Sequence, residues 1–165
     1  MMSIKRRPWL SIMLLTLSVS LSGCEILGPS RPGSVTAYAP AFEAASRGDV
    51  ATVSDAIAAK PSLVRKTEWG GNTLLHDAVE KGRQDVAALL LNQKADANAR
   101  NDNGFTPLHV AAQNGDLPMI RLLLAHGAGV RIFDKRGRTP ADIATAWNQA
   151  DAAALLHAEA GKGHR

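Results

Sequence analysis

The amino-acid sequence predicts an all-helical solenoid of about four helix-turn-helix repeats with short hairpin-like loops. Its clearest unit covers residues 103–134, where two short apolar helical patterns are separated by Gly115 and followed by a polar loop. The unit recurs, because Thr73, Thr106 and Thr139 are spaced 33 residues apart and a glycine stands two positions before each. One such unit cannot bury its apolar face alone, so we expect the copies to stack into one core.

Each of these threonines opens a short helical pattern with a shared signature. The sequence reads TLLH at 73–76, TPLH at 106–109 and TPAD at 139–142. This signature at a 33-residue period resembles the ankyrin repeat, and the resemblance covers residues 40–161. In that family the threonine and histidine of the signature hydrogen-bond within and between repeats. The resemblance therefore implies a structural role for five residues: Thr73, His76, Thr106, His109 and Thr139.

The resemblance also divides the chain. The expected repeats are residues 40–69, 70–102, 103–135 and 136–161, between a tether at 24–39 and a frayed tail at 162–165. The first repeat lacks the signature, and the last has Asp142 and Asn148 in place of histidine and glycine. Such departures are typical of terminal repeats, which cap the stack. Lys94 stands where the family has a left-handed glycine, so either that turn is relaxed or Lys94 tolerates strain.

Residues 1–23 resemble a bacterial lipoprotein signal peptide. A basic start at 5–7 precedes a 13-residue apolar run at 9–21, which is shorter than the roughly 17–25 residues that span a bilayer. The next residues, LSGC at 21–24, resemble a lipobox, and Cys24 is the single cysteine of the chain. The resemblance implies cleavage before Cys24 and its lipidation, including palmitate. The alternatives are an ordinary secretory signal with a chance cysteine and an uncleaved membrane anchor.

Lipidation would tether the domain to a membrane, since two or three acyl chains make a firm anchor. Glu25 follows Cys24, and the absence of Asp there favours the outer membrane facing the periplasm under the sorting rule of enteric bacteria. Removing the signal peptide leaves 16 of the 19 Lys and Arg residues against 15 Asp and Glu. This near balance does not favour a nucleic-acid partner, which needs a concentrated basic face. We expect a monomer.

The sequence shows no motif for a catalytic nucleophile, a phosphate-binding loop or a metal site, so we expect no enzyme activity and no cofactor. His76 and His109 would lie about one helix-packing distance apart, roughly 8–10 Å, which is too far to share a zinc ion with bonds near 2 Å. The remaining candidate is a protein-binding surface made of loop tips and exposed first-helix positions. Its predicted members are Glu68, Trp69, Asp77, Glu80, Asp102, Asn103, Val110, Gln113, Asn114, Lys135, Arg136, Ile143 and Trp147.

Trp69 is the sharpest candidate of this surface, because an aromatic side chain at a polar loop tip is typical of an interface hot spot. It could instead pack on the first repeat as a cap, and Val110 and Ile143 could instead touch neighbouring repeats. The predicted function is protein binding in the bacterial envelope, as an antidote that inhibits a toxic enzyme or as a scaffold or helper. A structural or stress-protective component without one tight partner, and an enzyme with an unrecognised site, are the alternatives.

Overall fold

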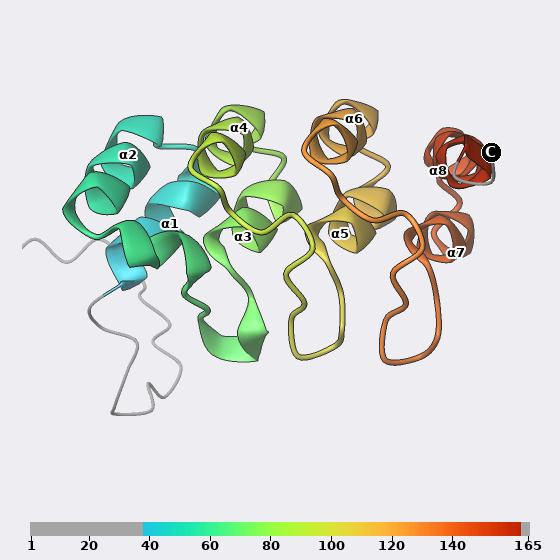
Figure 1. Ribbon diagram of the computed structural model, residues 1–165, viewed down its shortest axis with the longest axis horizontal. Coiled ribbons are helices and arrows are strands. Elements are labelled where there is room, and N and C mark those ends of the chain that lie inside the picture. The colour runs from blue at the N-terminus through green and yellow to red at the C-terminus, as the bar shows by residue number, and fades with distance from the viewer. Residues whose placement is uncertain (1–37, 163–165) are drawn as a thin grey trace, which may run out of the picture. The chain divides into compact units, whose positions relative to one another are not determined.

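The structure is a computed structural model that describes residues 38–162, all within one compact unit (Figure 1). The described chain forms eight α-helices in four hairpin pairs, with two short 3-10 helices before the second pair. The helices are α1 (Ala39–Arg47), α2 (Val50–Ala59), η1 (Pro61–Arg65), η2 (Trp69–Gly71), α3 (Leu74–Glu80), α4 (Gln84–Asn92), α5 (Pro107–Asn114), α6 (Leu117–Ala125), α7 (Pro140–Ala146) and α8 (Ala150–Lys162). The predicted all-α solenoid is confirmed.

The helices stack in two rows. The first helices of the pairs, α1, α3, α5 and α7, contact one another in sequence order, and the second helices, α2, α4, α6 and α8, form the other row. The loops that follow each pair project on one side of the stack (Figure 1). Each loop closes as a narrow hairpin, as the hydrogen bonds from Asn101 N to Phe105 O and from Asp134 N to Arg138 O show.

The core is rich in alanine and leucine, as the low aromatic content of 4% predicts. Small side chains allow the first helices to approach closely, and leucines from the second helices fill the space between the rows. Met119, Ile120 and Leu123 of α6 have no exposed surface, whereas Leu122 and Leu124 pack against the flank of the core. The apolar stripe predicted for this helix is therefore confirmed, with its edges half-buried.

The helix ends are set by local chemistry. The Thr73 and Thr139 hydroxyls accept hydrogen bonds from the N–H groups of His76 and Asp142, so they cap α3 and α7. The predicted left-handed turn at Asn148 is confirmed by its φ of 57°. Lys94 also adopts a left-handed conformation, with φ 65°, so the turn after α4 is not relaxed. This conformation costs a non-glycine residue about 1 kcal/mol.

The two ends of the described region differ slightly from the predicted boundaries. The helix α1 begins at Ala39, one residue earlier than predicted, and α8 continues through Gly161 to Lys162, where fraying was expected. Lys162 ion-pairs with Glu159 on the same helix. The predicted signal peptide at 1–23, the lipidation site at Cys24 and the tether through residue 37 lie outside the described residues. Within residues 38–162, no helix is long and apolar enough to cross a membrane.

Candidate functional site

The signature histidines are used entirely by the scaffold. The Nδ1 atom of His76 accepts from the Thr73 N–H at 3.2 Å, so its Nε2–H donates to Phe105 O of the next repeat at 3.0 Å. His109 repeats the arrangement with Thr106 and Arg138 O, at 3.1 and 3.2 Å. Burial lowers the pKa of both imidazoles, which favours their neutral forms. Both ring nitrogens of each histidine are thus occupied, and the structural role implied by the sequence is confirmed.

Asp142 takes the histidine position in the last repeat. Its Oδ2 atom accepts from the Thr139 N–H at 2.8 Å and from the Thr139 hydroxyl at 2.7 Å, and these bonds lower its pKa. A carboxylate reaches only its own helix start, whereas an imidazole also bridges to the following repeat. No further repeat follows α8 within the described residues, so the shorter side chain suffices there.

The predicted loop-tip residues are exposed, except Glu68, which is half-buried. Asp102, Asn103, Lys135 and Arg136 lie at the tips of the second and third loops. Trp69 lies in η2 with 86% of its surface exposed. The alternative in which Trp69 packs on the first repeat as a cap is therefore wrong.

The predicted first-helix positions separate into exposed and buried groups. Glu80, Asn114 and Trp147 are exposed, and Gln113 is half-buried. Ile143 has no exposed surface and Val110 packs against the core, so the predicted apolar strip on the binding surface is wrong. The burial of both side chains agrees with the alternative given by the sequence, in which they touch neighbouring repeats. Asp77 is only 7% exposed.

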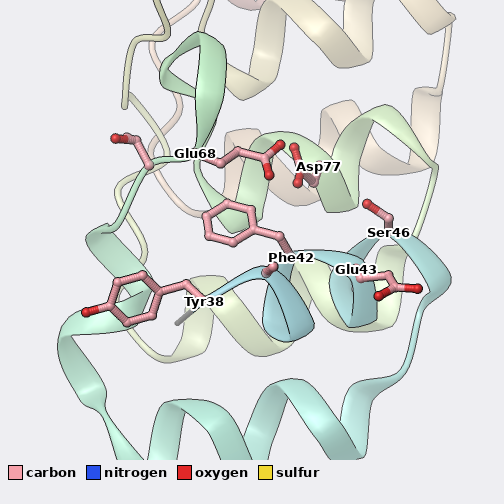
Figure 2. Close-up of a pocket in the computed structure, with 8 residues that line it drawn as sticks. Tyr38, Phe42, Glu43, Ser46, Glu68 and Asp77 are labelled. Atoms are coloured by element: carbon pink, nitrogen blue, oxygen red, sulfur yellow. The ribbon is translucent and has the colours of Figure 1, made fainter. Parts of the chain in front are cut away.

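Asp77 and Glu68 meet in a cavity of about 300 Å³ beside α1, which we call the N-terminal cavity (Figure 2). The cavity had no signal in the sequence, because its walls come from three separate segments: α1, the loop before α3, and α3 itself. The Phe42 ring lies next to the two carboxyl groups, which point towards each other (Figure 2). The complete lining consists of Tyr38, Ala39, Phe42, Glu43, Ser46, Thr67, Glu68 and Asp77.

Glu68 and Asp77, here called the acid pair, perturb each other. Burial raises the pKa of Asp77 to about 7, and the charge of Glu68 contributes to the increase. Burial also raises the pKa of Glu68, as does the nearby charge of Glu80. Two facing carboxyl groups interact favourably when they share one proton. Near neutral pH the acid pair therefore holds a proton that an ordinary exposed pair of acids would have lost.

Comparisons with known proteins agree with this architecture. Residues 75–124 match the family model described as ankyrin repeats (many copies). The chain is 41% identical over 64 residues to a probable E3 ubiquitin-protein ligase, XBOS33, of Oryza sativa subsp. japonica; the alignment covers 38% of this chain and 12% of that protein. It is 37% identical over 78 residues to ankyrin repeat domain-containing protein 13C of Danio rerio, covering 47% of this chain and 16% of that protein.

The chain thus spans less than a fifth of the length of these curated relatives. With the stacked helix pairs and the histidine bridges between repeats, the matches define the fold class as an all-α ankyrin-repeat solenoid. Repeats of this class form protein–protein interaction modules. The fold itself does not specify the partner, which depends on the surface side chains.

Proposed function

We propose that this protein is a membrane-anchored lipoprotein that uses its ankyrin repeats to bind another protein in the bacterial envelope, as an inhibitor or as a scaffold, without catalysis. The exposed side chain of Trp69 is the observation that carries the binding proposal. A tryptophan that is 86% exposed leaves most of its apolar surface in contact with water, which is unfavourable for the isolated domain. Its side chain also contributes nothing to the core. Tryptophan is also the residue most enriched at interface hot spots.

The loop tips support this proposal because they are held together before any partner arrives. Asp102 N donates to Gly70 O at 2.9 Å, and Lys135 N donates to Asn103 O at 3.1 Å, so each tip is hydrogen-bonded to the next. A side chain on Gly71 would lie 2.8 Å from the Asp102 backbone nitrogen, which explains the glycine at this contact. A preordered row of tips loses little conformational entropy on binding.

We expect Trp69→Ala to weaken capture of the partner by about 2 kcal/mol, or roughly thirtyfold, because the substitution removes the largest exposed apolar surface of the tips. The measurement is a pull-down of the tagged, acylated chain from its own membranes with mass spectrometry, followed by a binding titration of the recovered partner. Phe133→Ala is the matched control, since Phe133 is an exposed aromatic residue (56%) that is not a member of the predicted binding surface.

One dominant partner that is lost with Trp69→Ala and kept with Phe133→Ala would support the proposal. A diffuse set of proteins that neither substitution changes would contradict it and would favour a structural or stress-protective component. If the native chain, Trp69→Ala and Phe133→Ala all captured the same partner equally, the loop tips would not be part of the interface.

The anchoring part of the proposal is supported by the sequence alone, through the basic start, the short apolar run and the LSGC motif that ends at Cys24. After cleavage, residues 24–37 would join the lipid to the first repeat.

We expect Cys24→Ser to abolish both lipidation and signal cleavage, because the thiol is the acceptor for the diacylglyceryl group. The producing bacterium should incorporate labelled palmitate into the native chain and not into the variant, and the variant should migrate as the larger precursor. Unchanged labelling and unchanged gel mobility of Cys24→Ser in the membrane fraction would overturn the lipoprotein assignment.

A further inference from the structure

We propose that the N-terminal cavity binds a basic side chain, lysine or arginine, of the partner protein, with Glu68 and Asp77 as its carboxylate ligands. This inference rests on the proposed protein-binding function and specifies which chemistry the partner presents to the first two repeats. It is carried by the position of the two acids in the repeat, by their lack of other partners and by the cavity into which they point (Figure 2).

The repeat register shows that Asp77 is not required by the scaffold. The positions 33 and 66 residues later are Val110, which packs against the core, and Ile143, which has no exposed surface. An apolar side chain at this position stabilises the stack, whereas an aspartate residue that is only 7% exposed carries a desolvation cost. The second repeat therefore carries an acid where the other repeats carry core residues.

Glu68 departs from the register in the same way. The equivalent residues of the next two loops, Asn101 and Asp134, each accept two backbone N–H groups of their own loop, at 2.8–3.0 Å. They hold the hairpin closed. The carboxyl group of Glu68 instead extends towards Asp77 (Figure 2). Neither acid of the pair thus performs the structural task of its position.

Within residues 38–162, no cation forms an ion pair with the acid pair, although the charge of Lys81 acts to lower the pKa of Asp77. The other nearby acids are already paired, Glu43 with Arg47 and Glu80 with Lys81, each at 2.8 Å. Among the residues that the structure describes, no N–H or hydroxyl group donates to the carboxyl groups of Glu68 or Asp77, and the cavity lining includes no Lys, Arg or His. Asp77 is thus a nine-tenths buried polar side chain that opens on a cavity and has only another acid as its partner.

The walls of the cavity suit the rest of a basic side chain. The ring of Phe42 lies beside the acid pair, and Tyr38 lines the same space (Figure 2). Lys60 already places its ammonium group 4.6 Å from the centre of the Tyr38 ring, which shows that this ring can accept a cation. An aliphatic stem could contact the aromatic surfaces while its charged end reaches the carboxylates. A metal ion is a poorer occupant, because the described residues hold no cluster of three or more metal-ligating side chains.

Binding of a cation should release the shared proton. An ammonium or guanidinium group favours both carboxylates in ionised form, so the proton leaves to solvent and affinity should increase with pH across the neutral range. Other charged groups also lie near the cavity, and those on α1 and at the end of α3 form ion pairs with one another. They are Glu43 and Arg47 on α1, Glu80 and Lys81 at the end of α3, and Lys60 and Lys66 near Tyr38.

The test uses the purified full chain with N-acetyl-arginine amide as the probe and N-acetyl-citrulline amide as its neutral counterpart. We expect the arginine derivative to bind saturably and to shift the carboxyl NMR resonances of Glu68 and Asp77, with weaker binding at lower pH. Glu68→Gln and Asp77→Asn should each weaken binding at least about tenfold, as expected for loss of a buried charge-assisted hydrogen bond. Asp151→Asn, which replaces an exposed acid on α8, is the control and should change nothing.

Equal binding of the citrulline derivative, or no saturable shift of the two resonances, would overturn the cavity proposal. Circular dichroism checks that each variant keeps its fold. If Asp77→Asn alters the fold, Glu68→Gln, a substitution in a loop, still tests the proposal. Binding of the partner protein to these variants distinguishes the cavity proposal from the proposed function. A complex that depends on Trp69 and is indifferent to both acid substitutions would keep the proposed function and overturn the cavity. Arginine binding without any single protein partner would keep the cavity and overturn the proposed function.

Discussion

Replacing His109 by alanine should lower the free energy of unfolding by about 3–4 kcal/mol. The imidazole has no exposed surface, accepts from the Thr106 N–H and donates to Arg138 O, and its ring stacks on Phe105 at a centroid distance of 5.4 Å. Alanine would leave a cavity and two buried backbone groups without partners. Chemical denaturation followed by far-UV circular dichroism measures the change.

The same substitution should act most strongly on the last repeat. Since Arg138 O lies at the entry to α7, loss of the bond uncouples α7 and α8 from α5. Hydrogen exchange should then show lower protection in these two helices than in α3 and α4. The control is His157→Ala, an exposed histidine on α8. A loss of stability no larger than that of the control would contradict the bridging role of His109.

Replacing Asp77 by valine should raise the free energy of unfolding at neutral pH by about 2–4 kcal/mol. The native pKa of about 7, above the ordinary 3.8, means that the folded state holds a proton that the unfolded chain has lost. Ionisation of the native acid pair is therefore unfavourable. Valine removes this cost and matches Val110 at the equivalent position of the next repeat. The gain in stability would be accompanied by loss of the proposed cation site, a common trade-off at binding sites.

The pH dependence provides the signature of this effect. Because the folded pKa of Asp77 is raised, its carboxyl group lowers the stability of the native chain as pH rises from about 4 towards 7. The Asp77→Val variant should lose this decline. The buried histidines act in the opposite direction, since their lowered pKa values reduce stability when pH falls below their ordinary range near 6.5.

Unfolding titrations of the native chain and of Asp77→Val at several pH values measure this difference directly. Asp102→Val is the control, because Asp102 is an exposed acid at a loop tip and its replacement should change stability by less than about 0.5 kcal/mol. A gain for Asp77→Val that is the same at acidic and neutral pH would show that packing alone, and not relief of the acid pair, stabilises the variant.

The repeat, its period and most helix boundaries could be predicted from the amino-acid sequence. These features depend on short-range physics: a threonine hydroxyl caps the backbone three residues ahead, Gly115 and Asn148 adopt left-handed turns, and apolar residues recur on one helix face. The bridging histidines could also be predicted, because the same local signature places each one at the same point of the stack.

Which side chains lie on the surface depends on how the repeats pack against one another. The burial of Ile143 and the exposure of Trp69 depend on neighbouring repeats. The local sequence of a single repeat does not predict these contacts. The N-terminal cavity needs α1 beside α3, so Phe42 and Glu68 reach Asp77 from segments that no local pattern relates (Figure 2). The raised pKa of Asp77 then follows from burial and from a second carboxyl group, and both are properties of the folded neighbourhood and not of the residue type.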